Sequence, residues 1–194
     1  MGLQLDVQRI DLLARYLTLL AKWNRVYNLT GIRDARAMIA RHLLDSLSVH
    51  SHIKGPHVLD VGSGAGLPGI PLAIANPDLD FALLDSNAKK TRFIQQATIE
   101  LSLENVRVEH SRIESYRPEA GFDTVICRAF APVTDFVTTA SHACGPAGRM
   151  LAMKGRLQKN EQQWLRAMRS RVRTYKLKVP GIAAERQLVE ISSA

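Results

Sequence analysis

The chain has 194 residues, and its 26 basic and 18 acidic side chains give a formal net charge of +8. Its composition, 46% hydrophobic and 23% charged, is that of an ordinary globular protein, which can bury about 70% of its extended-chain surface. No apolar run approaches the ~18 residues of a membrane span, and residues 1–5 lack the layout of a signal peptide, so we expect neither secretion nor membrane insertion.

The first 54 residues predict a helical extension. Apolar residues recur three and four positions apart up to Val26, which indicates an amphipathic helix with a wide buried face. Residues 28–31 interrupt this pattern, and Asp34 is a good N-cap for a second helix. His42 and Asp45 lie three residues apart on one face of that helix, so we expect them to form a hydrogen-bonded pair.

Residues 55–194 predict one α/β domain. Short apolar runs alternate with helical segments, which is typical of a parallel, doubly wound sheet. Two final alternating runs, 174–179 and 187–191, predict an antiparallel strand pair that completes the sheet. The other predicted strands are 58–61, 81–85, 106–108, 124–127 and 150–153, and the predicted helices are 68–75, 89–101, 136–143 and one around Trp164.

The cysteines and histidines suggest neither a disulfide framework nor a metal centre. Cys127 and Cys144 lie among apolar residues, which is typical of a protein from a reducing, cytoplasmic compartment. His50 and His52 have no cysteine or acidic cluster near them in the sequence. We therefore expect no metal site.

Charge is unevenly distributed along the chain. Residues 1–54 carry a net charge of +4, residues 55–150 carry −3 and residues 151–194 carry +7. Basic flanks around a mildly acidic centre suit a protein that holds a small ligand centrally and binds a polyanion around it. Solvated surface charge explains the same counts, so composition alone leaves both interpretations open.

A glycine-rich turn follows the first predicted strand. Gly62, Gly64 and Gly66 fall where the chain bends into a helix, and ligands of open α/β sheets bind at such strand ends. Residues 64–69 also spell the dinucleotide pattern G-x-G-x-x-G, which is weak by itself. The turn has neither the Gly-Lys-Ser/Thr of a P-loop nor the spacing of a nucleophile elbow. It therefore predicts a nucleotide-like ligand, with a capped turn without ligand as the alternative.

Two carboxylates flank this turn. Asp85 lies 19 residues after Gly66, at the end of the second strand, where it or Ser86 can hold the ribose hydroxyls of an adenosine. Asp60 directly precedes the turn. Two carboxylates repel a pyrophosphate but suit a ligand with a cationic end. S-adenosylmethionine, with its sulfonium, ammonium and ribose, fits that description.

The segment after the turn, residues 68–71, reads Pro-Gly-Ile-Pro and is far more specific than the glycines alone. Through it and the segments below, the chain resembles over nearly its whole length the bacterial 16S ribosomal RNA guanine-N7 methyltransferases, also called glucose-inhibited division protein B. Gln187 departs from the pattern, since the family often has His there. The other segments are 22–24, 28–30, 41–47, 60–67, 84–86, 89–90, 111–114, 128–130, 154–155 and 185–186.

The resemblance implies a Rossmann-like class I methyltransferase fold, S-adenosylmethionine as cofactor, and N7 of a guanine in small-subunit ribosomal RNA as target. It implies that the cofactor site corresponds to Gly62, Leu67, Ile113, Glu114 and Arg128, with the Ile-Glu pair near the adenine. Ribosomal RNA or the small ribosomal subunit is the implied partner, and we expect a cytoplasmic monomer.

Guanine N7 has a free lone pair and no proton, so its methylation needs alignment and exclusion of water but no general base. Arg128 is the expected positioning residue; it could orient the cofactor's carboxylate or the base's O6, grip a phosphate, or only pair with Glu114. Cys127 admits a rival mechanism, thiolate attack on a pyrimidine, although its apolar strand favours a buried thiol. Phe130 is a candidate for stacking on the target base or for a core contact.

Two other function classes stay open. A nicotinamide-dependent reductase would use the G-x-G-x-x-G register, but the chain lacks a Tyr-x-x-x-Lys pair. A non-catalytic RNA-binding or ribosome-assembly module would need only the basic flanks. Arg171 and Arg173 are the pair that we expect to contact RNA phosphate. The other candidates are Arg33, Arg36, Arg41, Lys89, Lys90, Arg92, Arg166, Arg169, Lys176 and Lys178.

Overall fold

A computed structural model describes residues 2–129, 132–168 and 171–192, and within these ranges seven strands form one sheet in the order β3-β2-β1-β4-β5-β7-β6. Strands β1 to β5 are parallel, whereas β7 runs antiparallel to both β5 and β6. The predicted sheet and its antiparallel end are therefore confirmed. The strands are β1 (His57–Val61), β2 (Asp80–Asp85), β3 (Val106–His110), β4 (Phe122–Arg128), β5 (Cys144–Lys154), β6 (Val172–Lys176) and β7 (Gln187–Ser192).

The direction of winding reverses between β1 and β4. The chain passes from β1 outward to β2 and β3, then returns to β4 on the other side of β1 and continues to β5. At such a reversal the two adjacent strand-to-helix connections diverge and leave a crevice at the carboxyl ends of the strands. This crevice is where the predicted site residues should meet.

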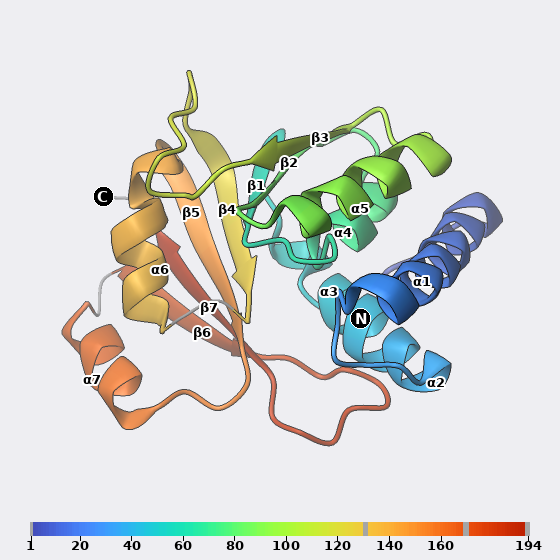
Figure 1. The fold of residues 1–194 in the computed structure, drawn as a ribbon. Coiled ribbons are helices and arrows are strands. Elements are labelled where there is room, and N and C mark those ends of the chain that lie inside the picture. The colour runs from blue at the N-terminus through green and yellow to red at the C-terminus, as the bar shows by residue number, and fades with distance from the viewer. Residues whose placement is uncertain (1, 130–131, 169–170, 193–194) are drawn as a thin grey trace.

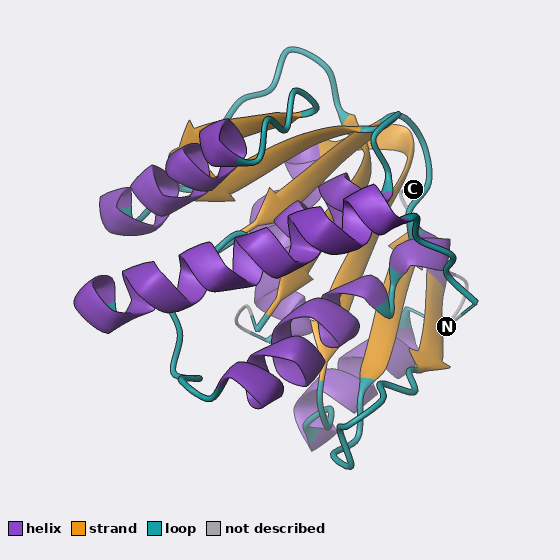
Figure 2. Cartoon of the chain, turned by 90° about the vertical axis from the view of Figure 1, so that its right-hand side faces the viewer, coloured by secondary structure: helices purple, strands orange, loops and turns teal. Residues whose placement is uncertain are grey.

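Helices cover both faces of the sheet (Figure 1). One layer consists of α1 (Val7–Tyr27), α4 (Gly69–Ala75) and α5 (Ala88–Glu100), and Figure 2 shows this layer with its helices in front of the strands. The other layer consists of α6 (Val133–Ala140), which ends in a 3-10 turn at 141–143, and α7 (Lys159–Ala167). Successive side chains of a strand point to opposite faces of the sheet, and each face packs against one helix layer. This explains the nearly continuous apolar runs of the sequence.

The N-terminal extension packs into the first layer. Helix α1 starts at its N-cap Asp6, whose carboxylate accepts the Arg9 N–H at 2.8 Å, and ends at Asn28 in the left-handed conformation. Tyr16 is fully buried, and its hydroxyl donates to the Ala65 carbonyl in the glycine turn at 2.7 Å. The extension thus shares the hydrophobic core with the sheet, and its Tyr16 holds the glycine turn in place.

The second predicted helix forms, but it is interrupted. Asp34 caps it as expected, accepting the Ala37 N–H at 2.7 Å. Between α2 (Ala35–Met38) and α3 (Asp45–Leu47), residues Ile39–Leu44 form a π-helical turn (η1). A π turn carries an additional residue and occurs often at functional sites. Periodicity could not predict it, because apolar residues on one face fit an α-helix equally well.

The expected hydrogen bond between His42 and Asp45 is wrong. His42 Nε2 lies 3.0 Å from the Thr30 hydroxyl and Nδ1 lies 3.2 Å from the Arg41 carbonyl, whereas the Asp45 carboxylate binds two arginines. Burial, reinforced by the charge of Arg128, lowers the pKa of His42 to about 4. The ring is therefore neutral near pH 7 and has no need of a carboxylate.

Within the described ranges, no helix is both long and apolar enough to cross a membrane. In the same part of the chain, no three His, Cys, Asp or Glu side chains are grouped so that they could hold a metal ion.

Candidate cofactor and substrate site

The glycine turn connects β1 to α4 through three residues with positive φ. Gly62, Gly64 and Gly66 have φ of 68°, 61° and 82°, a left-handed region that glycine occupies without steric cost. The backbone N–H groups of Gly62 and Ser63 donate to the Leu84 carbonyl at 2.8 and 3.0 Å. These bonds hold the turn against the end of β2.

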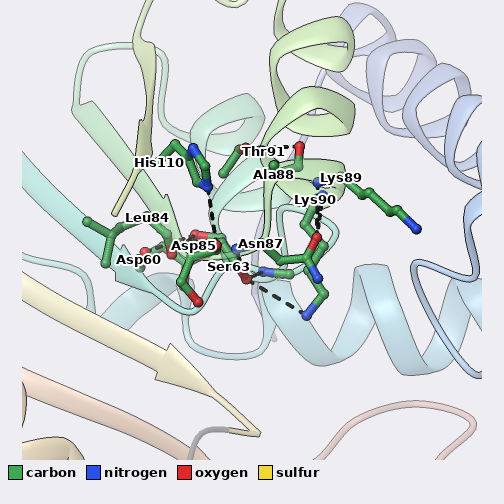
Figure 3. Close-up of polar contacts among 12 residues, drawn as sticks. Asp60, Ser63, Leu84, Asp85, Asn87, Ala88, Lys89, Lys90, Thr91 and His110 are labelled. Carbon is green, nitrogen blue, oxygen red and sulfur yellow. Dashed lines mark hydrogen bonds and ion pairs between the residues drawn. The ribbon is translucent and has the colours of Figure 1, made fainter. Parts of the chain in front are cut away.

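Asp85 fixes the turn from the neighbouring strand. Its Oδ2 accepts the Gly64 N–H at 2.9 Å, and its Oδ1 accepts the Asn87 N–H at 2.8 Å. Lys90 Nζ lies 3.9 Å from Oδ2, so Asp85 also contacts the first turn of α5 (Figure 3). Each carboxylate oxygen has a second lone pair, which leaves capacity to accept a ligand hydroxyl.

The first cavity opens beside this carboxylate and has a volume of about 370 Å³. Five of the predicted cofactor residues line it: Gly62, Asp85, Ser86, Ile113 and Glu114. They come from the ends of β1 and β2 and from the segment after β3, which the parallel pairing brings to one edge of the sheet. Adjacency of the strands therefore explains why residues 52 positions apart share one cavity.

Three other predicted cofactor residues are not among those that line the cavity. A β-carbon at Gly66 would come within 2.5 Å of the Ile70 side chain, so glycine is needed there for packing of the turn against α4. Leu67 is 4% exposed and belongs to the hydrophobic core. Gly64 has no protein atom closer than 3.9 Å to its would-be β-carbon. Their contacts with a cofactor stay a prediction.

Asp60, at the fourth position of β1, is a buried carboxylate with one vacant acceptor. Its Oδ2 accepts the Gly69 N–H at 2.9 Å, whereas Oδ1 has no hydrogen-bond partner among the described residues. Burial raises the pKa of Asp60 to about 7. An unpartnered buried carboxylate oxygen beside a ligand turn is costly unless a cationic group or a donor satisfies it. The vacancy fits a ligand with a positively charged end.

The raised pKa of Asp60 makes stability depend on pH. The folded state retains this proton up to about pH 7, but the unfolded chain releases it near pH 4, so stability falls as pH rises between these values. The loss reaches about 4 kcal/mol above pH 7, since one pKa unit corresponds to 1.36 kcal/mol. Asp60→Asn cannot titrate, so its free energy of unfolding relative to wild type should increase across this window. Denaturant titrations from pH 4 to 8 test this, and a pH-independent difference would contradict it.

A second cavity of about 360 Å³ adjoins the first, and Ala129 lines both. Ala129 has φ 52°, a conformation that alanine adopts rarely and that tends to be held in place at functional sites. Four basic side chains line this second cavity, and among the described residues of its walls Asp45 is the one acidic residue. The basic residues are Arg41, Arg128, Lys154 and Arg186, together with the neutral His42.

Arg128 lies at the end of β4 and lines the second cavity. Its ion-pair partner is Asp45, which the sequence analysis does not identify. The Nη1 of Arg128 is 3.2 Å from Asp45 Oδ2 and donates to the Arg41 carbonyl at 2.9 Å. The alternative pairing with Glu114 is therefore wrong, since Glu114 lies across the first cavity. Phe130, the candidate stacking residue, lies outside the described residues.

Cys127 is 2% exposed, with its side chain in the layer of α6 and α7. Burial raises the pKa of its thiol well above the ordinary range, and the charge of Asp60 adds to the effect. A nucleophilic cysteine needs an accessible thiolate. The buried-thiol interpretation is confirmed, and this geometry disfavours covalent catalysis at Cys127.

The basic C-terminal segment is split between opposite ends of the sheet. Lys176 pairs with Gln187, which pairs with Lys154 at the edge that holds both cavities. Arg173 pairs with Glu190 farther down the strand, and Arg171 precedes the strand. At roughly 3.3 Å per residue, Arg171 lies about 17 Å from the row of Lys176. The predicted RNA contacts of the two arginines thus lie at the end of β6 away from the cavities, and Arg169 lies outside the described residues.

Sequence reasoning identifies Arg128 in the walls of the second cavity but not its neighbours Asp45 and Arg186. Arg186 was visible only as part of a family segment, and Asp45 was assigned to the wrong partner. No local pattern could pair them, because they are 141 residues apart. Adjacency of β4, β5 and β7, together with the π turn, is what brings them together.

Solved structures share this fold. The O-methyltransferase TomG from Streptomyces achromogenes superposes with a TM-score of 0.65 at 16% identity, over 100% of this chain and 93% of that one. A SAM-dependent O-methyltransferase from Thermotoga maritima gives 0.60 at 13% identity, over 77% and 65%. The chain therefore has the Rossmann-like fold found in S-adenosylmethionine-dependent methyltransferases.

Sequence similarity narrows the class to a family. The profile of the family described as rRNA small subunit methyltransferase G matches residues 9–189. Proteins named Ribosomal RNA small subunit methyltransferase G from Nitrosococcus oceani and Alkalilimnicola ehrlichii are 53% and 50% identical, over 98% and 97% of this chain and 89% and 86% of theirs. The chain belongs to the rRNA small subunit methyltransferase G family, and the predicted family resemblance is confirmed.

Proposed function

We propose that this protein is an S-adenosylmethionine-dependent methyltransferase that methylates N7 of a guanine in small-subunit (16S) ribosomal RNA. The observation that carries the proposal is the pair of adjoining cavities at the reversal of the sheet, one beside two carboxylates and one walled by arginines. Family membership supports the class of substrate. The protein would act in the cytoplasm, as a monomer, on ribosomal RNA or the small subunit.

The residues of the first cavity fit S-adenosylmethionine. Asp85 or Ser86 would accept the ribose hydroxyls, and Ile113 with Glu114 would contact the adenine. The vacant Oδ1 of Asp60 would contact the cationic methionyl end, and a positive charge there would favour the ionised form of this carboxyl. When bound, the cofactor supplies an electrophilic methyl group on a sulfonium. No phosphate site is needed, which agrees with a turn flanked by carboxylates.

For this reaction the protein has to align N7 with the methyl group and to exclude water, but it does not have to move a proton. The N7 lone pair forms the new N–C bond as the sulfonium C–S bond breaks, and both electrons of that bond leave with sulfur. Because N7 bears no hydrogen, no side chain has to act as a base. Arg128, on the wall next to Ala129, would orient the base or its phosphate.

Cys127→Ser tests this mechanism. A buried thiol that only packs can be replaced by a hydroxyl of similar size, so we expect the variant to keep most of its methyl transfer from labelled S-adenosylmethionine to small-subunit RNA. The assay also separates an enzyme from a non-catalytic module, which would show no transfer with either protein. A covalent RNA adduct trapped at Cys127, or loss of transfer in a folded Cys127→Ser protein, would contradict the mechanism.

The position of the cavities predicts which basic residues contact RNA. Lys176 and Lys178 are exposed on the segment that leaves β6 at the cavity edge, whereas Arg171 and Arg173 are exposed toward its other end. Reversing both lysines to Glu should weaken RNA binding and reduce the slope of log affinity against log salt by about 1.4 to 1.8, since each phosphate contact contributes 0.7 to 0.9.

Reversal of Arg171 and Arg173 is the matched control, because it makes the same change in net charge at the opposite end of β6. It should change the salt slope less than the lysine pair does, and neither pair should alter cofactor affinity. Equal slopes for the two double variants would show that position on the sheet does not decide the contact, and would contradict the assignment.

A further inference from the structure

Asp45 binds two arginines that come from distant parts of the chain. Its Oδ2 lies 3.2 Å from Nη1 of Arg128, and its Oδ1 lies 3.1 Å from Nε of Arg186. The side chain of Asp45 is 8% exposed, and those of the arginines are 18% and 28% exposed. One carboxylate of the N-terminal extension thus joins the end of β4 to the residue preceding β7.

Asp45 holds the positive charges of Arg128 and Arg186 close together, although the two charges repel each other. Guanidinium groups do not lose their protons in proteins, so the pair is held only while a negative charge lies between them. Backbone carbonyls fix the remaining geometry: Arg128 Nη1 donates to Arg41 at 2.9 Å, and Arg186 Nη1 donates to Glu185 at 3.0 Å. Two acceptors therefore hold each guanidinium group in place.

One terminal nitrogen of each guanidinium group is left for a ligand. Among the described residues no hydrogen bond occupies Nη2 of Arg128 or Nη2 of Arg186, although both residues line the second cavity. The donors of an anchored guanidinium are suited to the oxygen acceptors of a nucleotide. Each oxygen of Asp45 binds one of the two arginines, so the removal of this carboxylate would release both of them.

We propose that Asp45 is a positioning residue for methyl transfer: it holds Arg128 and Arg186 side by side on the wall of the second cavity, with one donor of each directed to oxygen atoms of the target nucleotide. The inference rests on the proposed function, because it assigns the second cavity to the RNA substrate. It adds a role for Asp45 that is exerted through the two arginines.

Asp45→Asn distinguishes a positioning role from a purely electrostatic effect, because the two predict different changes in RNA affinity and in kcat. Loss of a negative charge among four basic residues should tighten RNA binding or leave it unchanged. Loss of positioning should lower kcat about 10- to 100-fold, because misplacement by about 1 Å costs rates of that order. We therefore expect a lower kcat with undiminished RNA affinity and with cofactor affinity within about twofold of wild type.

The matched control is Asp78→Asn, which removes the same charge from an exposed turn before β2. It should keep the wild-type kcat. A folded Asp45→Asn protein with wild-type kcat, or one whose loss appears wholly as weaker RNA or cofactor binding, would overturn the inference. Thermal unfolding and cofactor titration establish whether the variant is folded.

If Asp45→Asn fails to fold, Arg186→Lys tests the inference instead. This substitution keeps the positive charge but removes the planar guanidinium group with its several donors. The same fall in kcat with retained binding supports the inference, and wild-type kcat overturns it. The wild-type protein in the same assay distinguishes the two claims. No methylation by wild type would refute the proposed function and the inference with it, whereas equal turnover of wild type and variants would refute the inference alone.

Discussion

Gly64→Ala is expected to weaken S-adenosylmethionine binding about 10- to 100-fold in a protein that still folds. Gly64 has φ 61°, and its would-be β-carbon meets no protein atom closer than 3.9 Å, so the chain has room for a methyl group there. The open space lies at the turn that we assign to the cofactor, where an extra methyl overpacks the ligand by about 1–3 kcal/mol. Each 1.4 kcal/mol is tenfold in affinity.

Gly181→Ala is the control for backbone strain. Gly181 also has positive φ, 77°, but lies in the turn between β6 and β7, where its β-carbon would approach the side chain of Ala40 at 3.2 Å. Both variants should lose about 1–2 kcal/mol of stability from the left-handed conformation. Only Gly64→Ala should lose cofactor affinity in calorimetric titration. Wild-type affinity in a folded Gly64→Ala protein would refute the site.

Arg128→Ala is expected to slow the chemical step by on the order of 10²-fold. Its guanidinium joins Asp45 and the Arg41 carbonyl at the end of β4, next to the alanine that lines both cavities. Removal leaves the wall of the second cavity without one of its two anchored donors. Single-turnover kinetics with saturating cofactor and RNA measures this step directly.

Arg173→Ala removes the same side chain from the end of β6 away from the cavities and should leave the single-turnover rate unchanged. If Arg128 instead orients the carboxylate of the cofactor, its loss will appear as weaker cofactor binding. A rate for Arg128→Ala within about twofold of wild type would exclude a role in the transition state.

The sheet and the first cavity could be predicted because both depend on patterns of neighbouring residues in the sequence. Apolar runs of four to six residues separated by helical patterns define parallel strands, and the last residue of such a strand must lie at the ligand edge. This reasoning placed Asp85 and Ser86 in the cavity that the structure contains. It did not anticipate that Asp85 would also hold the Gly64 and Asn87 amides, since sequence does not give the path of a turn.

The second cavity could not be predicted because its walls come from six segments of the chain that are far apart in the sequence. Asp45 and Arg186 meet only when the extension, β4 and β7 are all in place, and the π turn changes which side chains near His42 share a face. Charge counts had the same limit. They showed that residues 151–194 are basic, but only the register of β6 distinguishes Lys176 at the cavity edge from Arg173 farther down.

The identity of the methylated nucleoside tests the central claim most directly. Small ribosomal subunits from a bacterial strain that lacks this gene are incubated with the purified protein and S-adenosylmethionine, and the small-subunit RNA is digested to nucleosides for mass spectrometry. We expect 7-methylguanosine to increase, and we expect the increase to require both the protein and the cofactor. Formation of 5-methylcytosine, or of no methylated nucleoside, would contradict it.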